Sequence, residues 1–219
     1  MCDTILAGPA ATADGAMLFG KNSDRQRNEA HVVERREGGE HAPGETVACT
    51  YIQVPQARRT HAALFCRPFW TWGPEMGANA CGVVIGNEAV HTRGPPPEAP
   101  TLIGMDLAGL ALQRAATAEE AVAVIGEPLA AHGQGGDCGH LTPSYYNNSY
   151  IVADRRRAFV METVGREWMV EEIATVRAIS NIYRTERPDR TSAGLDALIA
   201  ANGWPDPRGG YAAALADVA

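Results

Sequence analysis

Cys2, at the start of the chain, is the clearest candidate for chemistry. A small side chain after Met1 permits removal of the initiator, and a mature chain that starts at Cys2 carries a thiol and a free α-amine on one residue. The amine has a reference pKa of about 7.7–8.0 and the thiol one of about 8.5. At neutral pH the amine can therefore act as a general base for the thiol, which is the arrangement of an N-terminal nucleophile. A small buried hydrophobe is the competing interpretation of the same cysteine.

A charged turn supplies groups that could assist this thiol. An expected strand is followed by the run Phe19-Gly20-Lys21-Asn22-Ser23-Asp24-Arg25. In this turn Asp24 could orient the α-amine, and Lys21 could stabilise the thiolate. Of the 19 basic residues only Lys21 is a lysine, and a compact ammonium interacts differently from a planar guanidinium. Taken alone, the run equally fits a polar surface turn with a weak ion pair. Together with Cys2, the run is a more specific indication of a nucleophile site.

The elements that must position these groups are short strands, a helical section and further strands. We expect strands at residues 4–7, 16–19, 61–66, 83–85, 149–153, 159–164 and 176–179. Apolar spacing predicts a helix over Leu102–Arg114, and Thr117-Ala118-Glu119-Glu120 is typical of the start of a second helix. Pro128 should bend this second helix or end it early. A short helix is expected near Leu195–Ala201. This order predicts a layered α+β fold.

Composition and charge limit the classes of function. The 219 residues are 45% hydrophobic and 21% charged, which suits a packed globular domain. A net charge of -7 argues against a nucleic-acid-binding protein, because such proteins carry basic surfaces. No apolar run reaches the length of a bilayer span, so we expect no membrane segment. The start of the chain also lacks the basic and apolar regions of a secretory signal, which predicts a cytoplasmic protein.

The cysteines and histidines predict neither a disulfide framework nor a metal site. The number of cysteines is odd, and no C-x-x-C pair occurs among Cys2, Cys49, Cys66, Cys81 and Cys138. Free thiols are therefore expected rather than disulfides. Metal-ligating side chains recur in a glycine-rich stretch at His132, Cys138 and His140. Their spacing is unlike that of zinc sites, so a metal is the less favoured interpretation.

Five segments carry a resemblance to a known family. They are Cys2-Asp3-Thr4, Phe19 to Asp24, Arg67 to Asn79, Asn87-Glu88-Ala89 and His132 to Gly136. In this order they resemble the secernins, which belong with the bacterial cysteine dipeptidases of the N-terminal nucleophile (Ntn) hydrolase superfamily. The resemblance implies a single domain with a four-layer αββα sandwich over residues 1–219. It also implies a nucleophile at the start of a central strand and hydrolysis of amide bonds without a metal or organic cofactor.

More distant relatives, the bile-salt hydrolases and penicillin V acylases, imply a role for each candidate residue. Cys2 matches their nucleophile, and Asp24 matches the aspartate that holds the nucleophile and its amine. Lys21 falls where they have an arginine near the thiol, a departure shared with secernins. Asn87 and Asn181 fall on two asparagines of the oxyanion hole. Two donors aimed at a developing oxyanion are what acyl transfer requires.

The chain is short for this resemblance. Secernins and the dipeptidases commonly run to nearly twice this length, and the relatives carry an active-site arginine well beyond the second asparagine. Only 38 residues follow Asn181, and that role can be assigned to none of Arg184, Arg187, Arg190 and Arg208. We therefore expect either the N-terminal half of a longer architecture, incomplete at its C-terminal end, or a minimal form. Missing strands would expose a hydrophobic edge, so poor solubility or a homo-oligomer is expected.

The predicted function is cleavage of a small peptide by a cysteine-type Ntn hydrolase, most simply a dipeptidase. An N-acyl amide hydrolase (acylase) is the alternative among enzymes, and a non-catalytic interaction protein of the secernin type is the alternative outside them. No histidine lies in a motif suited to pair with Cys2, and the α-amine makes such a partner unnecessary. Trp70 and Trp72 are expected to be structural, with a place in a substrate pocket as the alternative.

Overall fold

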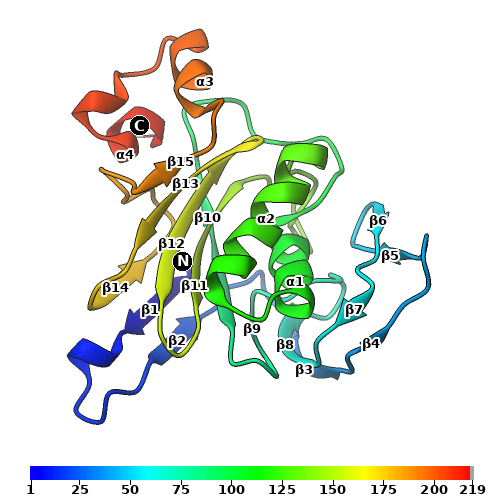
Figure 1. The fold of residues 1–219 in the computed structure, drawn as a ribbon. Helices are drawn as coiled ribbons and strands as arrows, with labels where there is room; N and C mark the ends of the chain where they lie inside the picture. Colours follow the sequence, from blue (N-terminus) through cyan, green and yellow to red (C-terminus); the bar gives the residue numbers. More distant parts are fainter. Residues whose placement is uncertain (218–219) are drawn as a thin grey trace.

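Two antiparallel sheets and one pair of helices form most of the structure, a computed structural model that describes residues 1–217 (Figure 1). The large sheet has eight strands in the order β15-β13-β12-β11-β10-β9-β8-β3, and the small sheet has three in the order β14-β1-β2. The large sheet consists of β3 (His31–Arg36), β8 (Ala63–Pro68), β9 (Met76–Asn79), β10 (Val84–Val90), β11 (Asn147–Ala153), β12 (Ala158–Val164), β13 (Glu167–Glu172) and β15 (Arg190–Thr191). The small sheet consists of β1 (Asp3–Ala7), β2 (Leu18–Asn22) and β14 (Val176–Ile179).

Two helices, α1 (Gly104–Arg114) and α2 (Ala118–His132), cover one face of the large sheet. Their apolar side chains form the main core with the sheet residues beneath them. The side chain of Thr117 caps α2 by accepting a hydrogen bond from the Glu120 N–H at 3.1 Å. Gly133 ends this helix with a positive φ of 79°, where glycine is favoured.

Pro128 lies inside α2 and does not end it, so the expected early end is wrong. A proline removes one backbone hydrogen bond from a helix. The side chains of Ile125 and Leu129 on either side of it are fully buried in the main core. Their burial offsets the missing bond, and the helix continues to its glycine cap.

The small sheet packs on the opposite face of the large sheet from α1 and α2 (Figure 1). Alternation along its central strand β1 places Thr4 and Leu6 against the large sheet, where both are fully buried. On the outer face Ile5, Leu18 and Val176 are 54%, 57% and 54% exposed. Within residues 1–217 no helix covers these side chains, so the described part forms three layers: helices, large sheet and small sheet.

Lys21 lies in a strand, which corrects the expectation that it belongs to a turn. The predicted strand 16–19 is shifted along the chain, because β2 begins at Leu18 and continues to Asn22. Its backbone pairs with β1 so that Lys21 is opposite Thr4. The Lys21 side chain is fully buried between the two sheets, whereas the next residue, Asn22, is exposed. The turn therefore begins only after Asn22.

The remaining elements include several that the sequence did not predict. The short helix α3 (Leu195–Ala201) has the predicted bounds, whereas α4 (Tyr211–Leu215) was not predicted. Two small antiparallel sheets lie beyond β3 and β8: β4 (Gly39–Glu40) pairs with β7 (Arg59–Thr60), and β5 (Thr46–Ala48) forms a hairpin with β6 (Gln53–Pro55). Short 3₁₀ turns occur at Pro9–Ala11 and Pro207–Gly209. In the described part of the chain, the helices are too short or too polar to cross a bilayer.

Candidate active site

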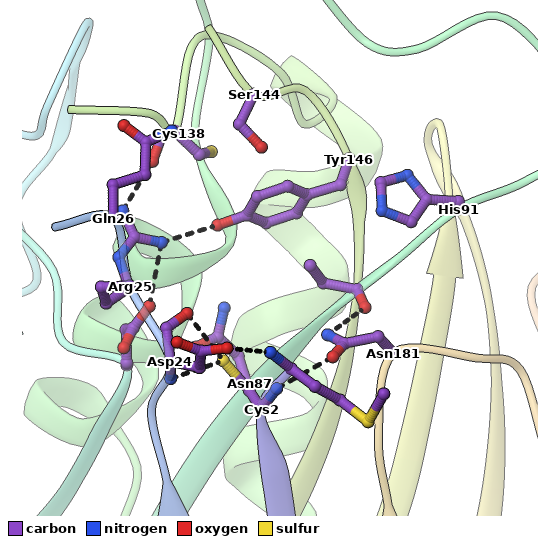
Figure 2. A pocket seen from close by; sticks show the side chains of 13 residues that line it. Cys2, Asp24, Arg25, Gln26, Asn87, His91, Cys138, Ser144, Tyr146 and Asn181 are labelled. Carbon is purple, nitrogen blue, oxygen red and sulfur yellow. Dashed lines mark hydrogen bonds and ion pairs between the residues drawn. The ribbon is translucent and has the colours of Figure 1, made fainter. Parts of the chain in front are cut away.

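A cavity of about 270 Å³ opens where the small sheet meets the large one. Figure 2 shows Cys2, Asp24, Asn87 and Asn181 grouped at one end of it and Ser144 and Tyr146 at the other. The wall is formed by Met1, Cys2, Asp24, Arg25, Gln26, Glu75, Asn87, Ala89, His91, Cys138, Ser144, Tyr146 and Asn181. Four of the five predicted site residues thus line one cavity, although they lie far apart in the sequence.

Cys2 stands at the start of β1, and both its nitrogen and its sulfur are held by hydrogen bonds. The Cys2 N–H donates to Asn181 Oδ1 at 2.9 Å, and Cys2 Sγ accepts from the Asp24 N–H at 3.2 Å. Burial raises the pKa of the Cys2 thiol, against opposing effects of the Asp24 N–H and the Lys21 ammonium. The thiol is therefore neutral near pH 7, and it needs a base in order to react.

Asp24 contributes to the site through its backbone and through its carboxylate. The carboxylate forms an ion pair with the Met1 ammonium, which raises the pKa of that ammonium. Both groups are well exposed, and the Met1 ammonium lies within the cavity wall. Once Met1 is removed, the Cys2 nitrogen becomes the α-amine, at hydrogen-bond distance from Asn181.

Lys21 lies behind the cavity, in a buried cluster between the two sheets. Its Nζ is 3.1 and 3.2 Å from the two carboxylate oxygens of Glu88, and both side chains are fully buried. Thr4 donates a further hydrogen bond to the same carboxylate. Burial raises the pKa of Glu88, and the positive charge of Lys21 opposes this effect. A Cβ on Gly86 would lie only 3.0 Å from Lys21 Cδ, so this glycine provides the room for the lysine.

A second charged cluster, centred on Arg25, supports the opposite end of the cavity. Arg25 contacts Glu29 at 2.7 Å and Glu75 at 3.1 Å, and it donates to the carbonyl of Cys138 at 2.6 Å. Glu75 also lies 2.9 Å from His31 Nε2. Burial would raise the pKa of Glu75, but the interactions with His31 and Arg25 lower it overall. The Arg25 guanidinium is thus neutralised by protein carboxylates.

The two predicted oxyanion-hole asparagines are oriented differently. Asn181 accepts from Cys2 through Oδ1, and its Nδ2 donates to the Ala89 carbonyl at 2.9 Å, which leaves one amide hydrogen to donate. Asn87 donates from Nδ2 to Asn148 Oδ1 at 3.0 Å and contacts the sulfur of Met105 at 3.7 Å. Its Oδ1 is buried without a partner among residues 1–217. Asn181 therefore has an amide hydrogen left to donate, and Asn87 has an oxygen left to accept.

The two tryptophans and the late arginines lie outside the cavity, whereas Cys138 lies in its wall. Trp70 donates to Glu29 at 2.8 Å, and Trp72 packs edge-on against Phe65 at 6.3 Å; neither lines the cavity. Among the described residues, the cavity wall includes none of Arg184, Arg187, Arg190 and Arg208. Within the described residues no group of three His, Cys, Asp or Glu is placed to hold a metal ion.

Sequence reasoning assigned no role to several residues that shape the site. Glu75, Glu88 and Gln134 all lie in segments that carry the family resemblance, so the signal was present without an assignment. Arg25 lies directly after Asp24 and was read as part of a turn. Asn148 had no signal in the sequence, because Asn87, to which it is bonded, is distant along the chain.

Solved structures with a similar fold include hydrolases, whereas no model of a known protein family matches the sequence. Two variants of the conjugated bile acid hydrolase from Clostridium perfringens have TM-scores of 0.58 and 0.55 and sequence identities of 13% and 15%. They cover 92% and 91% of this chain. The Caenorhabditis elegans ortholog of N-acylethanolamine-hydrolyzing acid amidase has a TM-score of 0.51, is 12% identical and covers 84% of this chain.

These likenesses establish the fold. The chain has the mixed α/β architecture of Ntn hydrolases, and the predicted fold class is confirmed. The described residues supply three layers of the αββα sandwich. This chain spans 56% of the length of each bile acid hydrolase chain and 71% of that of the amidase ortholog.

Proposed function

We propose that this protein is a cysteine hydrolase that cleaves an amide bond through a thioester on Cys2. The observation that carries the proposal is the environment of this residue. Its nitrogen is 2.9 Å from Asn181 and its sulfur is 3.2 Å from the Asp24 N–H, and all three residues line one cavity. A thiol next to a future α-amine in a polar cavity is the arrangement of an N-terminal nucleophile.

The proposed reaction starts after removal of Met1. The Cys2 α-amine takes the thiol proton, and Sγ attacks the substrate carbonyl carbon to form a tetrahedral oxyanion. The remaining amide hydrogen of Asn181 is available to stabilise this oxygen. The C–N bond then breaks, the leaving amine takes the proton from the Cys2 ammonium, and a thioester remains. Water, deprotonated by the same amine, hydrolyses the thioester and restores the thiol.

Lys21 and Asp24 assist this sequence in different ways. The Asp24 N–H points at the sulfur and favours its anionic form, while the carboxylate attracts the α-ammonium. Lys21 acts from behind the cavity, because its charge lowers the pKa of the thiol. Its pairing with Glu88 holds the ammonium in one place between the sheets.

The preferred substrate class is a small peptide, as in a dipeptidase. The cavity is small, and its wall carries the carboxylates of Asp24 and Glu75, which suits a substrate with an ammonium end, as a small peptide has. The family resemblance also favours this class. An N-acyl amide is the second candidate, because the two similar enzymes are named for acting on conjugated bile acids and N-acylethanolamines. A non-catalytic interaction protein remains the alternative of another class.

Selective labelling of Cys2 tests the proposal. An amide-mimicking electrophile, added to protein from which Met1 has been removed, should modify Cys2 first among the five cysteines. The matched control is Cys81→Ser, which removes an exposed thiol away from the cavity and should leave the labelling rate unchanged. Peptide mapping by mass spectrometry gives the modified residue. Labelling of Cys81 alone, with Cys2 unmodified, would contradict the proposal.

A further inference from the structure

A chain of buried side-chain amides leads from the cavity wall into the space between the large sheet and α1. It consists of Asn87, Asn148 and Gln134, whose side chains belong to residues only 4%, 1% and 6% exposed. Asn87 Nδ2 donates to Asn148 Oδ1 at 3.0 Å, and Asn148 Nδ2 donates to Gln134 Oε1 at 2.9 Å. Buried amides are costly unless their bonds are satisfied. Three in series therefore call for a functional reason.

The far end of this amide chain fixes the direction of its hydrogen bonds. Gln134 Nε2 lies 3.1 Å from the carbonyl oxygen of Gly165, which can only accept. The same nitrogen lies 2.9 Å from Thr163 Oγ1. That hydroxyl is 2.7 Å from the Asn148 carbonyl and 3.2 Å from Gln134 Oε1, so its single hydrogen goes to the nearer carbonyl and it accepts from Gln134 Nε2. Gln134 must therefore direct its Nε2 at these two groups and its Oε1 at Asn148.

The orientation of Gln134 determines that of Asn148, which in turn determines that of Asn87. Asn148 has to donate to Gln134, so its own Oδ1 is the acceptor that faces Asn87. Space for this amide is provided by Gly104, where a Cβ would lie 1.8 Å from Asn148 Oδ1. Asn87 consequently donates from its Nδ2 to Asn148, and its Oδ1 takes no part in the amide chain. Its oxygen has no partner within residues 1–217, although it is buried in a residue that lines the cavity.

We infer that Gln134 and Asn148 are positioning residues that keep the carboxamide oxygen of Asn87 available to the Cys2 cavity, where it accepts a hydrogen bond from a nitrogen of the substrate. This inference rests on the proposed amide hydrolysis and changes the role predicted for Asn87. An oxyanion needs a donor, and an acceptor would repel it. Oxyanion stabilisation is therefore left to Asn181, and Asn87 recognises an N–H group.

Two nitrogens of a peptide substrate offer such a group: the ammonium of the aminoacyl part and the N–H of the scissile amide. The surroundings of Asn87 favour the ammonium. Asp24 and Glu75 line the same cavity, and the three carboxylates of Asp24, Glu75 and Glu29 outnumber the one guanidinium of Arg25, which pairs with the last two. The Met1 ammonium itself lies in this cavity wall against Asp24.

Two substitutions of Asn148 test the positioning role. Asn148→Leu removes both of its hydrogen bonds, so Asn87 is free to turn and kcat/KM should fall about tenfold. Asn148→Asp should behave differently at different pH. A protonated aspartic acid donates to Gln134 and accepts from Asn87, as the native amide does, whereas the ionised form cannot donate. This variant should match the wild type at low pH and lose kcat/KM as pH rises, relative to the wild type.

Three substrates identify the nitrogen that Asn87 binds. Alanyl anilide carries both groups, propionyl anilide lacks the ammonium, and the phenyl ester of alanine lacks the scissile N–H. Removing the nitrogen that Asn87 binds should make wild type and Asn148→Leu equal on that substrate. We expect this for propionyl anilide. The control is Asn79→Leu, which removes a buried asparagine bonded to the carbonyls of Leu112 and Ala115, outside the amide chain. It should lower Tm without changing the ratios between substrates.

A measurement without substrate completes the test. In ¹⁵N-labelled protein the Asn87 Nδ2 hydrogens should exchange slowly with solvent, and this protection should be lost in Asn148→Leu. Fast exchange in the wild type, or unchanged kcat/KM for Asn148→Leu on all three substrates, would overturn the inference. An equal loss on all three would overturn the nitrogen contact. If the wild type hydrolyses none of them, the proposed function fails, and the exchange rates still decide how Asn87 is oriented.

Discussion

Between the two sheets, behind Cys2, the protein buries an ion pair, whereas between the large sheet and α1 it buries a series of neutral amides. Lys21 and Glu88 interact through charge, which acts over distance and tolerates small displacements. Asn87 and Asn148 interact through hydrogen-bond direction, which fails when one group turns. The first region therefore suits the tuning of a pKa, and the second suits the recognition of a substrate atom. Cys2 lies where the two regions meet.

The largest effect is expected at Cys2 itself. With Met1 retained, the nitrogen of Cys2 is an amide without useful basicity, and the hydrogen bond to Asn181 remains. The unprocessed protein should fold normally and show no acylation, and removal of Met1 should restore activity. Intact mass gives the processing state of the same sample that is assayed. Full activity of protein that entirely retains Met1 would exclude the N-terminal nucleophile mechanism.

The pH dependence of the processed protein follows from the same groups. Burial raises the pKa of the Cys2 thiol, so the thiol stays protonated and the reaction depends on a neutral α-amine. The rate should rise with pH as this amine loses its proton, near its reference pKa of about 7.7–8.0. The nearby positive charge of Lys21 lowers this midpoint and the Asp24 carboxylate, which attracts the α-ammonium, raises it, so Asp24→Asn should move the midpoint lower. A rate that is flat from pH 6 to pH 9 would contradict this assignment.

The next largest effect separates the ionic region from the amide region. Lys21→Met leaves the Glu88 carboxylate buried without its partner, which should lower the free energy of unfolding by about 3–5 kcal/mol. Urea denaturation measures this change. The double variant Lys21→Met with Glu88→Leu replaces both charges and should recover most of the loss. A single variant as stable as the wild type would show that the pair contributes little.

Loss of the Asn181 side chain should raise the activation free energy by an amount comparable to the loss of stability in Lys21→Met. It should leave the stability itself nearly unchanged. Asn181→Ala removes the amide hydrogen that faces the cavity and the acceptor of the Cys2 nitrogen. Turnover should fall about 10²–10³-fold with little change in Tm. Steady-state kinetics and thermal melting on the same preparation separate the two effects. An unchanged turnover would remove Asn181 from the reaction.

The smallest effect is expected for the Asp24 carboxylate. Asp24→Asn keeps the backbone N–H that contacts Cys2 Sγ and removes only a charge on a side chain that is 66% exposed. Interactions of exposed charges are weak, so turnover should fall only about two- to fivefold. Kinetics at low and high salt measure this charge effect, which should vanish at high salt. A loss as large as that of Asn181→Ala would mean that Asp24 holds the amine more tightly than this geometry implies.

The sequence predicted the strands that carry the site better than the edges of the fold. β14 and α3 have the predicted bounds, because their apolar patterns are short and clearly delimited. β3 (His31–Arg36) and β13 (Glu167–Glu172) were not predicted, since charged residues interrupt both. β3 pairs with β8, which lies far along the chain, and a local pattern does not contain that information, whereas β13 pairs with β12 directly before it, across the turn at Gly165.

In the candidate site, too, some features could be predicted from local patterns and others depend on distant partners. Cys2, Asp24, Asn87 and Asn181 were selected from motifs, and the structure brings them to one cavity. Their roles in catalysis stay predictions. The orientation of Asn87 could not be predicted, because it is set by Gly165 and Thr163 through two intervening amides. Sequence patterns can indicate which residue types gather, but the direction of a hydrogen bond depends on all the partners in three dimensions.

The burial of Lys21 has a practical consequence for chemical modification. It is the single lysine of the chain, and its side chain is fully buried against Glu88. The α-amine is then the one accessible primary amine, so an amine-reactive dye at neutral pH attaches one label per folded molecule, at the N-terminus. Because unprocessed and mature chains each carry one such amine, the identity of the labelled residue, Met1 or Cys2, gives the fraction of mature chains in a mixed preparation.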